Sequence, residues 1–174
     1  DAGNWYGVYC AGGHVDSLGL NANNLTGSVP SELGDLDHLT FLDLSYNQLS
    51  GPLPTTLAEL SNLRWMYLDG NQFSGVIPPQ LGDLELLEGL GLSSNQLTGL
   101  LPAELGNLTN LRWINLYGNQ LSGPIPPQLG DMELLESLEL SGNELTGSMP
   151  AELGKLTNLR WICMYENQLR GPLP

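Results

Sequence analysis

A period of 24 residues constrains the fold of this chain more than any other feature of its sequence. Its leading position is a leucine in every copy but the first, and the spacing has no insertion: Val15, Leu39, Leu63, Leu87, Leu111, Leu135 and Leu159. Each copy follows the pattern L-x-x-L-x-L-x-x-N-x-L-x-G-x-x-P-x-x-L-G-x-L-x-x, and the seventh is incomplete and stops at Pro174. Because repeats of roughly 20 to 50 residues stack on one another in an elongated array, the sequence predicts a solenoid.

The start of each copy predicts a short strand with one buried face. In the fifth copy, Ile114 and Leu116 alternate with Trp113, Asn115 and Tyr117, which is the period of two expected of a half-buried strand. Strands that recur every 24 residues without a hairpin turn must be parallel neighbours, about 4.8 Å apart. The asparagine of the pattern is predicted to form a ladder of bonds to buried backbone groups, since its amide both donates and accepts.

The seven proline-containing segments resemble the signature L-x-G-x-[IVL]-P of plant-type leucine-rich repeats. They read LTGSVP, LSGPLP, FSGVIP, LTGLLP, LSGPIP, LTGSMP and LRGPLP, and the resemblance covers residues 15–174. It implies a leucine-rich-repeat solenoid of the α/β or mainly β class. This is a right-handed arc with a concave parallel β-sheet, and with loops and short 3-10 turns on the convex side.

The resemblance also implies a division of the chain. Residues 15–174 form the seven repeats, and residues 1–14 resemble the end of the family's N-terminal cap, C-x-x-W-x-G-V-x-C. The matching residues are Trp5, Gly7, Val8 and Cys10, whereas the upstream cysteine of the cap is absent. We therefore interpret residues 1–14 as the remnant of such a cap.

The two cysteines, Cys10 and Cys163, are expected to be free thiols. Six coils place them on the order of 30 Å apart, whereas a disulfide needs Cα atoms within about 7 Å of each other. No C-terminal cap follows the last coil in the sequence, so homotypic packing through this uncapped end is one expected contact.

Composition excludes several classes of partner. With 19 acidic and 5 basic residues the net charge is −14, and nucleic-acid binding depends on clustered Lys and Arg, so we expect no nucleic-acid partner. No apolar run approaches the roughly 18 residues needed to cross a bilayer, so we expect no membrane insertion within this segment.

We find no catalytic residues in the sequence and expect no enzymatic activity. The two histidines, His14 and His38, are interpreted as lying at different positions of the repeat; neither has a neighbouring nucleophile, so we expect a surface or cap role for both. No Cys–His spacing typical of a metal site and no phosphate-binding glycine loop is present, so no metal and no cofactor is expected.

Function must then reside in the positions that the pattern leaves free on the concave face. The candidate partner-binding residues are Phe41, Asp43, Trp65, Tyr67, Asp69, Trp113, Asn115, Tyr117, Glu139, Trp161 and Tyr165. One explanation is packing, in which each tryptophan folds over a small neighbour, Gly89 or Ser137. The other is recognition, because exposed aromatic residues dominate protein interfaces. The tryptophans recur every 48 residues, so duplication of a two-repeat block explains their regularity as readily as selection does.

A column of alternating charge precedes the aromatic positions. It runs Arg64, Glu88, Arg112, Glu136 and Arg160, and strand spacing predicts a ladder of ion pairs worth at most about 1 kcal/mol each. This ladder uses three of the five basic residues, so an anionic ligand is disfavoured.

We expect a non-catalytic recognition module that binds a protein or peptide, neutral or cationic, as in a receptor ectodomain or a secreted inhibitor. One alternative is a structural array without a ligand of its own, and another is a protein that adsorbs to a lattice such as ice through its regular Ser and Thr columns. The sequons at Asn24 and Asn107 are candidate glycosylation sites and favour an extracellular or cell-surface location over the cytoplasmic alternative.

Overall fold

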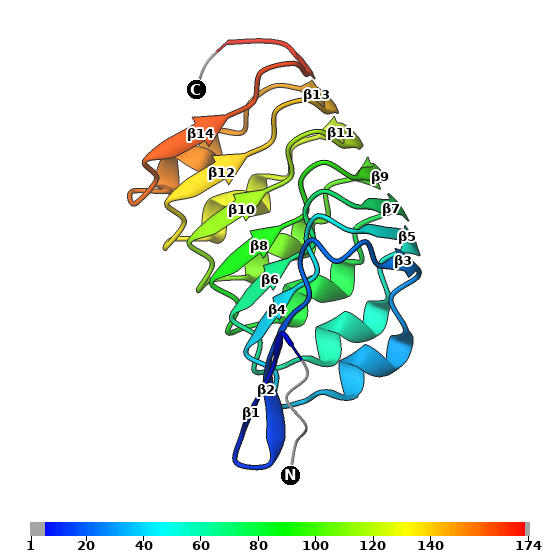
Figure 1. Cartoon of the computed structure of the whole chain (residues 1–174). Coiled ribbons are helices and arrows are strands. Elements are labelled where there is room, and N and C mark those ends of the chain that lie inside the picture. The colour runs from blue at the N-terminus through cyan, green and yellow to red at the C-terminus, as the bar shows by residue number, and fades with distance from the viewer. Residues whose placement is uncertain (1–5, 173–174) are drawn as a thin grey trace.

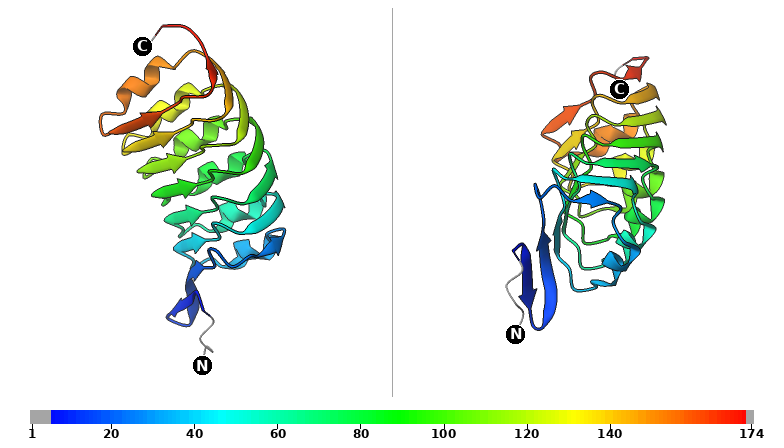
Figure 2. Two further views of the ribbon diagram at one scale, coloured as in Figure 1. Left: turned by 45° about the horizontal axis from the view of Figure 1, so that its top comes forward. Right: turned by 45° about the vertical axis from the view of Figure 1, so that its right-hand side comes forward.

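The computed structural model describes residues 6–172 and winds them into a solenoid with one coil per repeat (Figures 1 and 2). Each complete coil contributes one strand to a long sheet, a second strand to another sheet, and a 3-10 helix that returns the chain to the next coil. Among the described residues every helix is of the 3-10 type. The predicted solenoid is confirmed.

The concave sheet runs the length of the solenoid in the order β1-β2-β4-β6-β8-β10-β12-β14. Its strands are β1 (Val8–Ala11), β2 (His14–Gly19), β4 (Phe41–Asp43), β6 (Trp65–Tyr67), β8 (Gly89–Gly91), β10 (Trp113–Asn115), β12 (Ser137–Glu139) and β14 (Trp161–Cys163). From β2 onward the strands are parallel, and each residue lies opposite the one 24 positions on, as Trp113 lies opposite Gly89 and Ser137.

A second parallel sheet and a row of 3-10 helices complete the coils. The sheet contains β3 (Thr26–Gly27), β5 (Gln48–Pro52), β7 (Gln72–Gly75), β9 (Gln96–Leu100), β11 (Gln120–Pro124), β13 (Glu144–Gly147) and β15 (Gln168–Leu169). The helices are η1 (Ser31–Asp35), η2 (Thr55–Glu59), η3 (Pro79–Asp83), η4 (Ala103–Asn107), η5 (Pro127–Asp131) and η6 (Ala151–Lys155). Each helix follows directly on the proline of the repeat, whose fixed φ is suited to a helix start.

The N-terminal pair of strands differs from the rest of the concave sheet. β1 and β2 form an antiparallel hairpin, and the two residues between them, Gly12 and Gly13, have φ of +59° and +88°. A two-residue hairpin turn with both φ values positive favours glycine. β1 thus covers the edge of the sheet where the sequence predicts a cap remnant. The expected boundary after residue 14 falls within β2, and Trp5 lies outside the described residues.

The leucine columns form one continuous core. The leading leucines Leu39 to Leu135 are fully buried, whereas Val15 and Leu159, in the first and last coils, are only partly buried. A single coil leaves its apolar face open on both sides, so burial depends on neighbouring coils.

The predicted asparagine ladder is confirmed. Asn71 Oδ1 accepts the Leu49 N–H at 3.0 Å, and Asn71 Nδ2 donates to the carbonyls of Leu44, Leu68 and Asp69 at 2.9 to 3.3 Å. The same arrangement recurs from Asn47 to Asn167. Each amide satisfies buried backbone groups of two successive coils, which couples the coils to one another.

Candidate functional site

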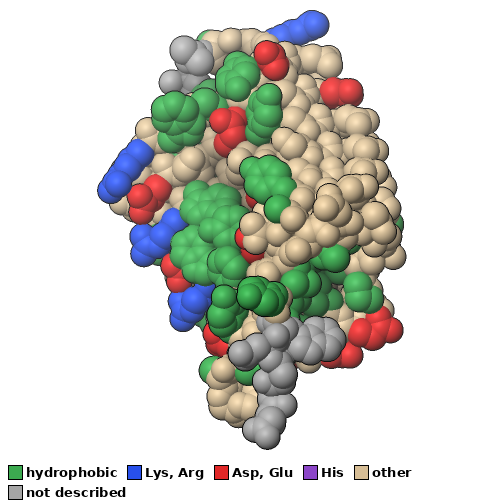
Figure 3. Space-filling model, in the orientation of Figure 1, with side chains coloured by type: hydrophobic (Ala, Val, Ile, Leu, Met, Phe, Trp, Pro, Cys, Tyr) green, Lys and Arg blue, Asp and Glu red, His purple; other side chains and the backbone are tan. Residues whose placement is uncertain are grey.

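Four aromatic side chains of the concave sheet lie together and form what we call the aromatic cluster, namely Phe41, Trp65, Tyr67 and Trp113. The ring centroids of Phe41 and Tyr67 are 5.7 Å apart and those of Tyr67 and Trp113 are 5.2 Å apart. Trp65 and Trp113 stack across β8, with centroids 6.3 Å apart and an interplanar angle of 24°. Figure 3 shows the apolar surface that gathers over this part of the sheet. These separations are those of favourable aromatic pairs.

Gly89 makes this cluster continuous. A β-carbon at Gly89 would lie 2.5 Å from Cε2 of Trp113, so only glycine lets this indole lie flat on β8. Trp113 thus covers its small neighbour and reaches Trp65 beyond it. This is the arrangement expected from the packing explanation, and it also builds a broad, half-buried aromatic surface.

The acidic candidates at the carboxyl ends of the strands are tied to the scaffold. Asp69 extends over Gly91, where a β-carbon would collide with it, and its Oδ1 accepts the backbone N–H and the hydroxyl of Ser93 in the next coil at 2.9 and 2.6 Å. Asp43 accepts the same two groups of Ser45 within its own coil at 3.0 and 2.6 Å. These hydrogen bonds hold the two carboxylates in place, so both residues stabilise the shape of the surface and also give it negative charge.

The charge of these two aspartates acts on the tyrosine between them. Partial burial raises the pKa of Tyr67, and the negative charges of Asp43 and Asp69 raise it further. Tyr67 therefore stays protonated and can donate a hydrogen bond at neutral pH.

A hollow of about 570 Å³ lies on the other side of Trp113. We call it the Trp113–Trp161 hollow; it is lined by Arg112, Trp113, Ile114, Asn115, Glu136, Ser137, Glu139 and Trp161. Trp161 is 60% exposed, which contrasts with the half-buried Trp113. The structure thus divides the candidates into the aromatic cluster with its two aspartates and a more open group around this hollow.

The remaining polar candidates of the open group also contact the backbone. Asn115 Oδ1 accepts the N–H of Tyr117 at 3.1 Å, and Glu139 Oε1 accepts the N–H of Ser141 at 2.8 Å. Tyr117 and Tyr165 are 39% and 57% exposed. Partial burial and the negative charge of Glu139 raise the pKa of the Cys163 thiol, so this cysteine is a poor nucleophile at neutral pH.

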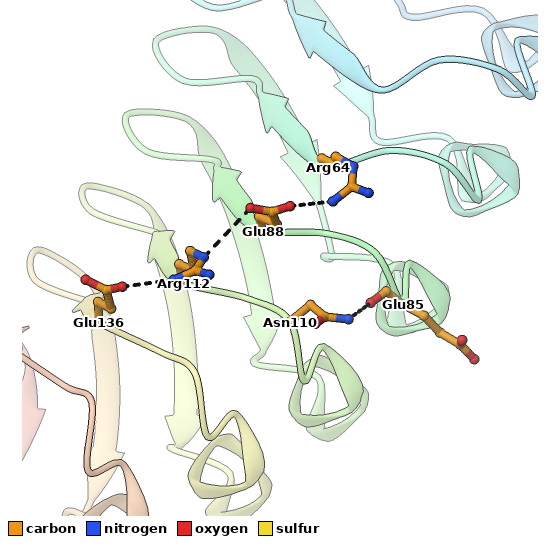
Figure 4. Close-up of polar contacts among 6 residues, drawn as sticks. All are labelled: Arg64, Glu85, Glu88, Asn110, Arg112 and Glu136. Carbon is orange, nitrogen blue, oxygen red and sulfur yellow. Dashed lines mark hydrogen bonds and ion pairs between the residues drawn. The ribbon is translucent and has the colours of Figure 1, made fainter.

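The predicted charge ladder is confirmed along the other end of the strands (Figure 4). Arg64 bonds to Glu88 at 2.6 Å, Arg112 approaches Glu88 at 3.8 Å and Glu136 at 3.2 Å, and Arg160 bonds to Glu136 at 3.3 Å. All three arginines are about half exposed or more, so the pairs maintain register more than they add stability.

Sequence reasoning missed two further columns. The rings of His14 and His38 have centroids 3.8 Å apart, so the interpretation that they lie at different positions of the repeat is wrong. Their spacing of 24 residues is the signal that pairs them. Asn62, Asn110 and Asn158 each donate to a carbonyl of the preceding coil, as Asn110 Nδ2 does to Glu85 O at 2.8 Å. Their 48-residue spacing is the corresponding signal.

The asparagines of both sequons are accessible to solvent. Asn24 and Asn107 are both exposed, and Asn107 is the last residue of η4.

Between residues 6 and 172, no three His, Cys, Asp or Glu side chains are grouped as metal ligands. Within the same residues, no helix has the length and hydrophobicity to cross a bilayer.

Two sheets, an asparagine ladder and a row of 3-10 helices define a solenoid with one coil per repeat. Residues 14–121 match the family model described as a leucine-rich repeat region, and residues 134–156 match a second described as a leucine-rich repeat. The chain belongs to the leucine-rich-repeat family, and its repeats are of the plant type. No curated protein matches the chain closely enough in sequence to count as a relative.

Solved structures of plant receptor kinases are similar to the chain. The leucine-rich-repeat ectodomain of GASSHO1/SCHENGEN3 from Arabidopsis thaliana, in complex with CASPARIAN STRIP INTEGRITY FACTOR 2, is 43% identical with a TM-score of 0.96 and covers 98% of this chain. The ectodomain of the Arabidopsis receptor kinase HAESA, in complex with an IDA peptide hormone ligand, is 34% identical with a TM-score of 0.88 and also covers 98%. Pollen Receptor Kinase 3 is 36% identical with a TM-score of 0.87 and covers 99%.

The chain spans a small part of the longer of these proteins. It covers 21% of the GASSHO1/SCHENGEN3 structure and 33% of the HAESA structure, but 84% of the Pollen Receptor Kinase 3 structure.

Proposed function

We propose that this chain is a non-catalytic recognition module that binds a peptide or an extended protein segment on its concave sheet. The observation that carries the proposal is the aromatic cluster, which is continuous across β4, β6, β8 and β10 and opens into the Trp113–Trp161 hollow. Aromatic side chains on a rigid sheet bury much area at little cost in conformational entropy, which is typical of binding surfaces.

The solved neighbours support a peptide-like partner and an extracellular location. HAESA was solved with a peptide hormone ligand, and the GASSHO1/SCHENGEN3 structure is that of a plant membrane receptor ectodomain. The exposed sequons at Asn24 and Asn107 are compatible with export, and we infer that both carry N-linked glycans in a secretory host.

The lattice-binding alternative is not favoured by the second sheet. Its Ser and Thr column is half-buried from Ser50 to Thr146, and it lies beside the exposed apolar side chains of Val76 and Leu100. A surface complementary to ice would need a flat and uniform polar array, whereas this one is uneven.

Selection from a displayed random-peptide library on the immobilised chain tests the proposal. We expect the triple variant Trp65→Ala, Trp113→Ala, Trp161→Ala to lose at least about tenfold in affinity for the selected peptides. A matched control, Val76→Ala with Leu100→Ala, removes two exposed apolar side chains from the second sheet and should bind as the wild type does.

If the triple variant does not fold, a single variant still tests the proposal. Trp161 is mostly exposed, so Trp161→Ala should keep the far-UV circular dichroism of the wild type and still weaken peptide binding. Unchanged binding in the folded triple variant would favour the alternative of a structural array without its own ligand.

A further inference from the structure

Ser137, beside the Trp113–Trp161 hollow, lies at the position of the repeat that Gly89 occupies two coils earlier. Both residues lie between two tryptophans, but one is a serine and the other a glycine. Trp65, Gly89 and Trp113 lie in register on β6, β8 and β10, and Trp113, Ser137 and Trp161 lie in register on β10, β12 and β14. Over Gly89 the indole of Trp113 fills the space, whereas over Ser137 a volume of about 570 Å³ stays open.

The side chain of Ser137 accounts for the difference. The indole of Trp113 occupies the place where Gly89 would carry a β-carbon, and Ser137 has that atom together with a hydroxyl group. An indole cannot lie equally close to β12. The two tryptophans of the C-terminal half therefore border a hollow, which leaves ring surface accessible to a partner.

The charges around the hollow compensate one another at the amino ends of the strands, whereas negative charge is in excess at the carboxyl ends. At the amino ends of the strands, Arg112 contacts Glu88 and Glu136, and Glu136 also bonds to Arg160, so opposite charges compensate there. At the carboxyl ends, Glu139 has no basic partner in the described part of the chain; its Oε1 accepts the backbone N–H of Ser141, and its carboxylate also interacts with the Cys163 thiol.

The wider surroundings of Glu139 are also acidic. The carboxyl ends of the strands of the concave sheet and the loops just beyond them carry Asp43, Asp69 and Glu166 and no Lys or Arg. A negative charge beside the exposed Trp161 and the half-buried Trp113 is complementary to a cation, which interacts favourably with both the carboxylate and the ring faces.

We propose that the Trp113–Trp161 hollow binds a cationic side chain, arginine or lysine, of the partner that occupies the concave sheet. The charged group lies against Glu139, and its apolar stem or planar guanidinium lies along the indoles of Trp113 and Trp161. This inference rests on the proposed function of the sheet. Arginine fits best, because its guanidinium is planar and stacks on aromatic rings while it donates to a carboxylate.

Titration of the chain with capped amino acids tests this inference directly. The probes are N-acetyl-arginine methylamide, its neutral isostere N-acetyl-citrulline methylamide and N-acetyl-phenylalanine methylamide. The ¹H–¹⁵N signals of the tryptophan indoles, assigned with Trp→Phe variants, report where each probe binds. We expect millimolar binding of the arginine probe that shifts the Trp113 and Trp161 signals and leaves Trp65 in place. The citrulline and phenylalanine probes should bind at least about fivefold more weakly.

Two variants locate the determinants of this binding. Glu139→Gln keeps an oxygen acceptor for the Ser141 N–H and removes the charge, so it should reduce arginine binding to the citrulline level. Ser137→Gly should let Trp161 fold onto β12 as Trp113 folds onto β8, and thereby abolish binding of the arginine probe. Glu104→Gln, an exposed residue of η4 on the convex side, is the matched control and should leave binding unchanged.

Three results would overturn the inference. They are equal affinity for arginine and citrulline, arginine binding that survives Glu139→Gln, and absence of arginine binding up to about 50 mM probe. Each of them leaves the proposed function standing if the triple tryptophan variant still loses its selected peptides. Peptide binding that survives in the triple variant would instead remove the proposed function itself.

Discussion

The indole of Trp113 lies on Gly89, so close that a β-carbon at Gly89 would be 2.5 Å from its Cε2. Gly89→Ser should therefore displace the indole, break its stacking on Trp65, and cost about 1 to 3 kcal/mol of unfolding free energy. The shift of the Trp113 indole ¹H–¹⁵N signal and the midpoint of urea unfolding measure both effects. Gly154→Ser is the control, since a β-carbon there would meet nothing within 4 Å. Equal losses in the two variants would contradict the close contact.

The asparagine ladder should be much more costly to break inside the array than at its start. Asn95 accepts the Phe73 N–H and donates to three carbonyls, so Asn95→Ala leaves buried backbone groups unpaired and should cost at least about 2 to 4 kcal/mol. Asn23 is exposed, and its amide donates to Asn21 O at 3.2 Å, so Asn23→Ala should cost less than about 1 kcal/mol. Urea unfolding followed by far-UV circular dichroism compares them. Similar losses would show that the amide bonds do not couple the coils.

Two serines at equivalent positions should respond oppositely to removal of the hydroxyl. Ser93 Oγ donates to Asp69 at 2.6 Å, whereas Ser141 Oγ is buried without a hydrogen-bond partner among the described residues. Ser93→Ala should destabilise the protein by about 1 to 2 kcal/mol, and Ser141→Ala should be neutral or stabilising by up to about 1 kcal/mol. Thermal unfolding of the two variants decides this, and a destabilised Ser141→Ala would reveal a partner for that hydroxyl.

Alkylation of Cys163 should report the charge of Glu139. Only the thiolate reacts, and a raised pKa lowers its fraction at every pH below that pKa, so iodoacetamide at about pH 8 should modify Cys163 more slowly than the exposed Cys10. Glu139→Gln removes the negative charge and should accelerate modification of Cys163 about two- to threefold. Mass spectrometry of the alkylated peptides gives both rates, with Glu104→Gln as the control. An unchanged rate in Glu139→Gln would show that this carboxylate does not act on the thiol.

Several features of the candidate site can be predicted from the sequence. The Arg64 to Arg160 charge ladder and the Asn47 to Asn167 amide ladder both depend only on which residues are 24 positions apart, because parallel strands in register place such residues side by side. The stacked pair of His14 and His38 follows from the same rule, because these residues are also 24 positions apart.

Other features depend on side-chain packing that no spacing expresses. Asp43 bonds within its own coil to Ser45, whereas Asp69 crosses to Ser93 of the next coil because Gly91 leaves it room. The antiparallel hairpin around Gly12 and Gly13, whose φ values are positive, begins before the repeats, where the 24-residue pattern makes no prediction of strand pairing.

The sequence by itself determined the coil, the register and the core, because copies spaced by 24 residues bury their leucines only when the coils stack in register. Only the tertiary structure decided how the side chains at the variable positions of the concave sheet pack against one another. Trp113 and Trp161 occupy the same place in their repeats, yet Trp113 packs on the preceding strand whereas Trp161 is 60% exposed. The physical reason is that the space above each strand depends on whether a β-carbon stands on the neighbouring strand, at Gly89 or at Ser137.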